Sequence, residues 1–194
     1  MFERFTKDAR AVVEGAYAHA EEGGSASVDA GHLLLALLDR EESRAASALA
    51  ALGLARPPER EVVRRALREA RRRAGLTRAE ADALAGLGID VSRIVARVEE
   101  VHGVGAMSGD HGGAGPRRRA GRRPGFSREA RAVLERALRV ALARRERFVG
   151  DEHLLLALTV LPGVAGEALA DGGVTFAGVS EVCPPTRPAH AAGA

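Results

Sequence analysis

The sequence is poor in aromatic residues, cysteine and lysine. Phe, Tyr and Trp make up 3% of the 194 residues, and Trp is absent. A core must therefore be filled by Ala, Leu and Val, a mixture that favours helix over sheet. Cys183 is the only cysteine, so the chain forms no internal disulfide and no multi-cysteine metal site. A reducing compartment fits this cysteine usage.

Long apolar segments are also missing. No apolar run reaches the roughly 18 residues that are needed to span a bilayer, and the charged first ten residues are followed by no apolar signal segment. We expect a cytoplasmic protein without a membrane partner. The formal charge of +3 is carried almost entirely by Arg, since Lys7 is the only lysine. An Arg- and Ala-rich bias also arises from GC-rich coding, so it is not evidence for a nucleic-acid partner.

An internal repeat is present instead. The segment from Phe5 to Glu14 aligns with the segment from Phe126 to Glu135, at an offset of 121 positions. The six residues from His32 to Leu37 recur unchanged from His153 to Leu158 at the same offset. Because two separate blocks share one offset, we interpret the repeat as a genuine duplication.

The repeats read as helices. Thr6 and Ser127 are good N-cap residues, and each is followed by apolar positions at spacings of three and four, the first set ending near residues 23–24. Asp29 and Asp151 are predicted to cap second helices that run to about Leu38 and Leu161 and are buried all round. Third helices are expected over residues 43–52 and 164–170. The sequence therefore predicts an all-α fold, a pseudo-twofold tandem repeat of helical motifs.

The segment between the copies divides into three parts. A basic amphipathic helix is expected over residues 59–74, a helix that begins with a capping box at residues 77–80 follows it, and another is capped by Asp90 and runs to Val101. The predicted organisation is repeat one over residues 1–54 and 84–102, a helical insertion over 55–83, a Gly- and Arg-rich flexible linker over 103–125, repeat two over 126–183, and a disordered tail over 184–194.

The opening residues carry a family resemblance. The stretch Met1-Phe2-Glu3-Arg4-Phe5-Thr6 resembles the start of the N-terminal repeat domain of ClpC-type unfoldases. The stretch from Val149 to Leu158, which includes Asp151-Glu152-His153, is similar to a second segment of that family. The resemblance covers residues 1–54 and 84–182. It implies a domain that receives substrates and adaptors for an ATP-driven motor that feeds a protease.

The motor itself is missing from this sequence. No G-x-x-x-x-G-K-[ST] phosphate loop occurs, and the chain leaves no room for an ATPase module. We therefore expect a non-catalytic, stand-alone binding protein without a cofactor. Its implied partners are peptides or protein degrons, cyclic-peptide antibiotics and a Clp unfoldase.

The resemblance also implies two sites. In ClpC-like relatives an acidic residue in each repeat helps to hold phosphorylated arginine. Gly31 replaces it in repeat one, whereas Glu152 retains it in repeat two beside the additional charge of Asp151, so an unmodified cationic peptide is an equally good candidate ligand. A second family surface binds cyclic-peptide antibiotics, and the positions that match it here are Phe2, Arg10, Phe126, Arg131 and Glu135. The two Phe residues are predicted to form an apolar anchor.

Several simpler interpretations compete with these sites. Glu152 also suits the positive end of a helix dipole. His32 and His153 are each followed by three leucines, which leaves no second metal ligand at helical spacing and favours a structural hydrogen bond. His102, Asp110 and His111 lie in or beside a Gly-rich segment, which argues against a preformed metal site. No catalytic grouping stands out, and Cys183 is placed in the tail.

The main alternative function is binding of nucleic acid or an acidic surface. Basic clusters at residues 117–119 and 122–123, together with the basic helix, would contact phosphates while the repeats serve as a scaffold. Because the aromatic residues that stack on bases are missing between these arginines, we favour the peptide-binding interpretation.

Overall fold

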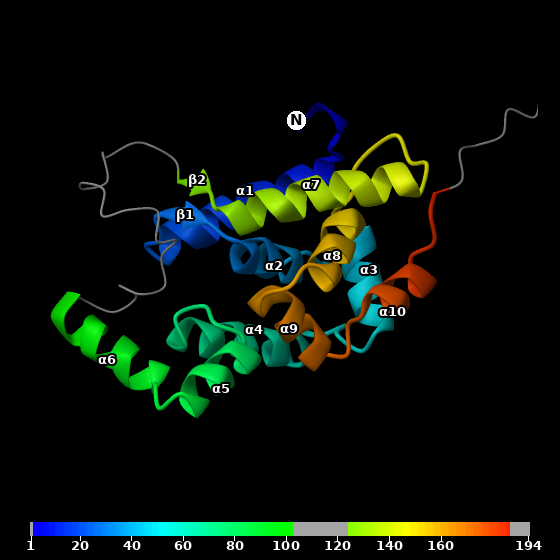
Figure 1. The fold of residues 1–194 in the computed structure, drawn as a ribbon. Helices are drawn as coiled ribbons and strands as arrows, with labels where there is room; N and C mark the ends of the chain where they lie inside the picture. Colours follow the sequence, from blue (N-terminus) through cyan, green and yellow to red (C-terminus); the bar gives the residue numbers. More distant parts are fainter. Residues whose placement is uncertain (1, 103–123, 187–194) are drawn as a thin grey trace, which may run out of the picture.

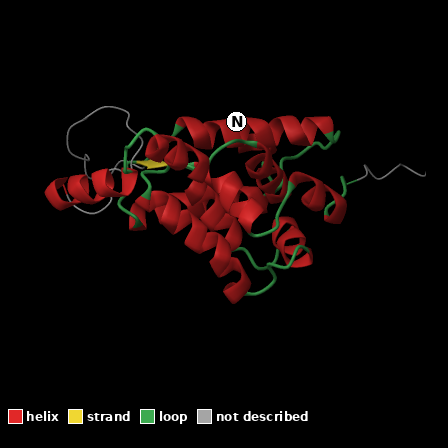
Figure 2. Ribbon diagram, turned by 60° about the horizontal axis from the view of Figure 1, so that its bottom comes forward, coloured by secondary structure: helices red, strands yellow, loops and turns green. Residues whose placement is uncertain are grey.

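The first helix of each repeat begins where the sequence predicts. In the computed structural model, which describes residues 2–102 and 124–186, these helices are α1 (Lys7–Glu22) and α7 (Arg128–Ala143). The Ala9 amide donates to Thr6 Oγ1 at 3.2 Å, and the Ala130 amide donates to Ser127 Oγ at 3.1 Å. Both helices bury the apolar face that their spacing predicts. The fold class is therefore all-α, as Figure 2 shows.

The second helices form the centre of the molecule. They are α2 (Ala30–Leu38) and α8 (Asp151–Val160), and Figure 1 shows them beneath α1 and α7. Leu33, Leu34, Leu154 and Leu155 have no exposed surface, which confirms the prediction of buried central helices. As predicted, Asp29 caps α2, because its carboxylate accepts the His32 amide at 2.9 Å.

The predicted cap of α8 by Asp151 is wrong. The N-cap residue is Gly150, and Asp151 is the first residue of the helix. Its carboxylate accepts the Ala45 amide at 3.2 Å, at the start of α3 (Arg44–Ala51) in the other repeat. The Asp151 carboxylate thus binds at the N-terminus of α3 instead of capping its own helix. Helix α8 consequently starts one residue earlier than expected.

The remaining helices pack across the two repeats. Helix α3 packs on α8, and α9 (Val164–Asp171) packs on α2. The last helix, α10 (Phe176–Val182), covers α3 and α8. It was not predicted from the sequence. Helix α4 (Pro57–Arg72) covers α9 and α2 in the corresponding way. We therefore assign α4 to the first repeat, as the counterpart of α10, rather than to an insertion.

Two further helices follow α4. Helix α5 (Arg78–Gly86) is capped by Thr77 as predicted, and α6 (Val91–His102) begins after Asp90, whose carboxylate accepts the Arg93 amide at 3.2 Å. Helix α6 packs on α5 and extends away from the central helices (Figure 1). The predicted linker lies outside the described residues except for its last two positions.

Short parallel pairings join the repeats in a symmetric way. Strand β1 (Ser27–Val28) pairs with β2 (Gly125–Phe126), with Val28 opposite Phe126. At the other end of α1, Phe5 pairs with Val149. The two pairings are related by the offset of 121, so the start of each repeat is held by the other repeat. Gly125, predicted to belong to the linker, is ordered by this sheet.

The end of the second repeat is also fixed. Cys183 is 5% exposed and belongs to the hydrophobic core, so it is part of the second repeat, within the predicted bounds of 126–183, and not of the tail. The next residues lie against α3, since the Pro184 carbonyl accepts from Arg44 at 2.7 Å. Residues 187–194 lie outside the described residues. Among the residues that the structure describes, no single helix is long and apolar enough to cross a membrane; α8 and α9 pass that test only jointly, with a bend of 98° between them.

Candidate functional site

The predicted anchor residue Phe126 is half-buried on β2. Its ring contacts that of Tyr17 on α1, with centroids 5.2 Å apart and planes inclined by 55°. Tilted aromatic pairs of this kind add to the stability that burial provides. The backbone of Phe2 belongs to a short 3-10 helix, Phe2–Arg4, but its side chain lies outside the described part of the chain. The meeting of Phe2 with Phe126 stays a prediction.

The charged residues of the same predicted surface are exposed. Arg10 lies on the outer face of α1, and Arg131 and Glu135 lie on the outer face of α7. The Glu135 carboxylate is 3.7 Å from the Arg139 guanidinium, one helical turn further along. An exposed pair of this kind holds its side chains only weakly. These groups are therefore accessible to a partner molecule.

Glu152, in contrast, is buried in a charged cluster. Its carboxylate accepts from the Arg44 guanidinium at 2.6 Å, and the Glu146 carboxylate lies 3.9 Å from the same guanidinium. Arg44 also donates to Thr186 Oγ1 and to the Pro184 carbonyl, each at 2.7 Å. The resemblance assigns the Glu152 carboxylate to the binding of an arginine ligand, but here Arg44 of the same chain already binds it. A ligand must therefore displace Arg44 to reach Glu152.

His153 lies beneath the cluster with no exposed surface. Its Nδ1 accepts the Gly150 amide at 2.9 Å, so the neutral ring carries its proton on Nε2. Nε2 lies 2.5 Å from Glu146 Oε2, a contact whose angles do not fit a regular hydrogen bond. In the first repeat, His32 Nδ1 accepts the Asp29 amide at 3.1 Å. The predicted structural role of both histidines is confirmed, because each one satisfies an amide at the start of its helix.

Burial sets the protonation of this cluster. It raises the pKa of the Glu152 carboxyl to about 7, which outweighs the hydrogen bond that lowers it and the attraction of Arg44. Burial also lowers the pKa of His153 below its ordinary value, so the ring is neutral near pH 7. The cluster therefore changes its net charge near neutral pH through Glu152.

The same residues have the composition of a metal site. Glu146, Glu152 and His153 each place one ligand atom within 4.8 Å of the others. A metal at His153 would require the Nε2 lone pair, and moving the proton to Nδ1 would break the hydrogen bond from Gly150. The Arg44 guanidinium already supplies the positive charge. The geometry fits an internal ion-pair cluster.

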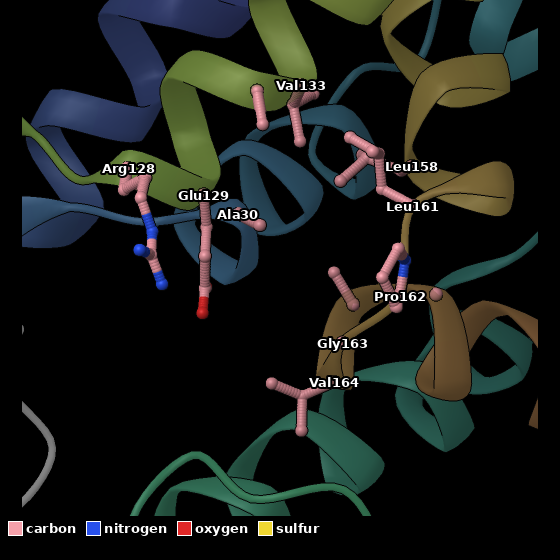
Figure 3. Close-up of a pocket in the computed structure, with 12 residues that line it drawn as sticks. Ala30, Arg128, Glu129, Val133, Leu158, Leu161, Pro162, Gly163 and Val164 are labelled. Carbon is pink, nitrogen blue, oxygen red and sulfur yellow. The ribbon is translucent and has the colours of Figure 1, made fainter.

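A pocket lies at the position that the repeat relates to Arg40 and to the contact between Asp151 and Ala45. It has a volume of about 160 Å³ and lies between the start of α7, the start of α2 and the turn from α8 to α9. Figure 3 shows Arg128 and Glu129 projecting from α7 at one side, with Leu158, Leu161 and Val164 around the remainder. Three counterparts explain the difference between the halves: Ala30 stands for Asp151, Leu161 for Arg40 and Val164 for Arg44, since α3 and α9 begin 120 positions apart. Small and apolar residues here replace the charged groups that fill the other half.

The helices and the symmetric pairings together define a duplicated all-helical domain. A family model described as the Clp repeat (R) N-terminal domain matches residues 4–83 and 125–183. The chain belongs to this family. The match includes α4 and omits residues 84–124, whereas the resemblance inferred from sequence omitted 55–83.

The fold of one solved structure agrees with that of this chain. The N-terminal domain of the caseinolytic protease associated chaperone ClpD from Arabidopsis thaliana is 19% identical, covers 94% of each chain and superimposes with a TM-score of 0.53. The Hsp104 N-terminal domain from Candida albicans is 15% identical and covers 93% of this chain and 89% of its own, with a TM-score of 0.47. A search of curated protein sequences gave no match.

Arg44 and the pocket are the features of these sites that sequence reasoning missed. Arg44 belongs to no recognisable motif. It is separated from Glu152 by 108 positions in the sequence, so the pair cannot be detected from a local pattern. The duplication nevertheless contained a signal for the pocket. A position-by-position comparison of the copies shows charged residues in one that are small or apolar in the other.

Proposed function

We propose that this protein binds peptide segments or degrons of other proteins and carries out no catalysis of its own. The observation that carries this proposal is its membership of the Clp repeat N-terminal domain family over both repeats. Domains of this kind receive the substrates of Clp unfoldases. The protein acts in the cytoplasm, either as an adaptor that presents its cargo to a Clp machine or as a decoy that sequesters it.

The surface that we assign to this role contains the exposed charges of α1 and α7 and the half-buried Phe126. Arg10, Arg131 and Glu135 offer both signs of charge to a peptide. The Phe126 ring supplies apolar area beside Tyr17. An aromatic anchor with a charged rim is the usual composition of a binding hot spot. Cyclic-peptide antibiotics, which present apolar side chains on a compact backbone, are a second ligand class for this surface.

Phosphoarginine is the least favoured of the family ligands. Gly31 leaves the first repeat without the acidic residue, and Arg44 blocks Glu152 in the second. We therefore propose that Glu152 has a structural role and that peptide binding depends on Phe126.

The direct experiment is a titration of the full chain with three probes: phosphoarginine, a cyclic-peptide antibiotic and an unmodified Arg-rich peptide. We expect Phe126→Ala to weaken peptide binding by about tenfold, the cost of truncating one aromatic anchor. Phe148→Ala is the matched control, because Phe148 is 58% exposed outside this surface. Glu152→Ala should weaken binding only as far as it weakens the fold. The proposal is rejected if neither these ligands nor Clp unfoldase subunits bind to the wild type.

On the described residues, the alternative of nucleic-acid binding has the exposed Arg65 and Arg72 of α4 in its favour. Residues 117–119 and 122–123 lie outside the described part of the chain. Within α4, Arg60 is buried, Arg64 donates to Asp39 at 2.6 Å, and Arg68 pairs with Glu61. Arg60, Arg64 and Arg68 therefore serve the fold, so the basic helix offers fewer free charges than its sequence suggests.

A further inference from the structure

The pocket between α2, α7 and α9 has two kinds of lining. Its wall is apolar and includes Val133, Leu158, Leu161 and Val164. A cavity of about 150 Å³ with such a lining can hold a benzene molecule, so about 160 Å³ suits one branched aliphatic side chain. The remainder of the lining consists of helix starts, because Ala30, Arg128 and the first residues of α9 all belong to the first turn of a helix.

The start of α9 favours a negative charge. Each helix N-terminus has a partial positive charge and amides without intrahelical partners. Gly163, the N-cap residue of α9, offers no side-chain cap. Arg128 adds a full positive charge at the rim, next to the carboxylate of Glu129. Asp29 caps α2 and Ser127 caps α7, so the start of α9 is the uncapped one of the three helix starts around the apolar cavity.

The other half of the molecule shows what such a position binds. The start of α3 is the repeat counterpart of the start of α9, and its Ala45 amide donates to the Asp151 carboxylate at 3.2 Å. The counterpart of Ala45, the second residue of α3, is Ala165, the second residue of α9, which lines the pocket, and the counterpart of Asp151 is Ala30. The start of α3 therefore faces an internal carboxylate, whereas the start of α9 faces the methyl group of Ala30 and open space.

The backbone at this point is fixed by close packing. A Cβ atom at Gly166 would lie 2.8 Å from the Leu161 carbonyl oxygen, so only glycine fits there. The turn from α8 to α9 is consequently held against the start of α9. The pocket is part of the packed fold.

We propose that this pocket binds the C-terminal residue of a peptide, with an aliphatic side chain against the apolar wall and the terminal α-carboxylate at the start of α9. The ligand carboxylate takes the place that Asp151 occupies in the other half, and Arg128 contributes charge from the rim. This assignment rests on the proposed peptide-binding function and names a class of peptide for it: free C-termini that end in Leu or Val. The site is distinct from the Phe126 surface.

The experiment uses the full chain and a fluorescent hexapeptide that ends in Ala-Leu, prepared once with a free carboxylate and once as the C-terminal amide. Anisotropy titration should show at least about tenfold tighter binding of the acid, because a charge-assisted hydrogen bond is lost in the amide. Ala30→Asp places an internal carboxylate in the pocket and should reduce binding of the acid to the level of the amide. Asp is well tolerated in the first turn of a helix, so this variant should fold.

Two further variants complete the design. Arg128→Ala should weaken binding of the acid several-fold, whereas Lys7→Ala, the same loss of charge at the counterpart position, should leave it unchanged. Leu161→Arg restores the residue type of Arg40 and should block the pocket if Ala30→Asp folds poorly. Equal binding of acid and amide, no binding of either, or full binding by both blocking variants would overturn the assignment. If only the acid preference fails and binding still depends on Phe126, the proposed function stands without this pocket.

Discussion

The Arg44 guanidinium binds the Glu152 carboxylate at 2.6 Å across the boundary between the two repeats. Arg44 is the first residue of α3, and Glu152 lies in the first turn of α8. The pair is asymmetric in its exposure, since the Arg44 side chain is 40% exposed and that of Glu152 only 4%. Arg44 therefore neutralises a buried charge from the surface, and this geometry determines what its removal should cost.

Replacing Arg44 by Ala should destabilise the protein by about 2 kcal/mol at pH 8. A fully buried ion pair that loses one partner costs about 3 to 5 kcal/mol, and the exposure of Arg44 reduces that figure. Urea unfolding followed by circular dichroism measures the change. Arg56→Ala is the control, because Arg56 pairs with Glu59 on the surface and its loss should cost under about 0.5 kcal/mol. Equal effects of the two substitutions would show that Glu152 is not stabilised by Arg44.

The stability of the wild type should fall between pH 5 and pH 8 relative to Glu152→Gln. The folded protein holds a proton on Glu152 up to about pH 7, whereas the unfolded chain releases it near its ordinary value of 4.5. The folded state thus binds more protons in this interval, and its stability decreases as pH rises. The shift corresponds to a loss on the order of 3 kcal/mol.

Urea titrations at several pH values test this slope. Glu135→Gln is the matched control, because the Glu135 carboxyl is exposed on α7. A wild-type curve parallel to that of Glu152→Gln would contradict the raised pKa of Glu152.

Arg60→Met should destabilise the fold by about 2 kcal/mol through the carbonyl groups that it leaves unpaired. The buried Arg60 guanidinium donates to the carbonyl oxygens of Leu54, Leu38 and Arg40 at 2.9, 2.6 and 2.8 Å. Met retains most of the apolar volume but none of the donors, and an unsatisfied buried polar group costs about 1 to 3 kcal/mol. Thermal unfolding measures the loss, with Arg56→Met as the exposed comparison. A change no larger than that of Arg56→Met would show that water satisfies these carbonyls.

Cys183 should react slowly with a thiol reagent in the native protein. Burial shields its sulfur and raises the pKa of the thiol, so little thiolate forms near pH 8. We expect a rate at least roughly tenfold below that in denaturant, as measured with Ellman's reagent. Reaction at the same rate in both conditions would place Cys183 in an accessible tail instead.

Helices and their caps were predictable because their signals are local. Thr6, Ser127 and Asp29 bond to amides three residues away, within reach of a short sequence pattern. Asp151 has the same chemistry, but its partner Ala45 lies 106 residues away, so the pattern gave the wrong cap. Strands of two residues have no periodicity to detect, and α10 is too short for a helical pattern to stand out.

The candidate site was predictable to a lesser degree. Glu152 and Phe126 could be identified as candidates from the repeat. The sequence did not predict that Glu152 is buried against Arg44 or that Phe126 lies against Tyr17. Burial depends on contacts between segments that are distant in sequence. The division of the chain into an insertion, a linker and a tail stays a prediction. The structure departs from it at three places, because α4 packs as part of the first repeat, Gly125 belongs to β2, and Pro184 to Thr186 lie against α3.

The exchange of chain starts between the halves has a consequence for assembly. Phe5 pairs with Val149, and Phe126 pairs with Val28, so each half completes the backbone pairing of the other. The arrangement resembles a dimer whose subunits exchange their N-terminal arms, with both subunits joined in one polypeptide. Neither half is a complete folding unit, and the two should unfold in one cooperative step. The entropy of closing the connection grows only by about 0.6 kcal/mol per doubling of its length. Insertions between α6 and β2 can therefore lengthen the chain at this point without loosening the domain.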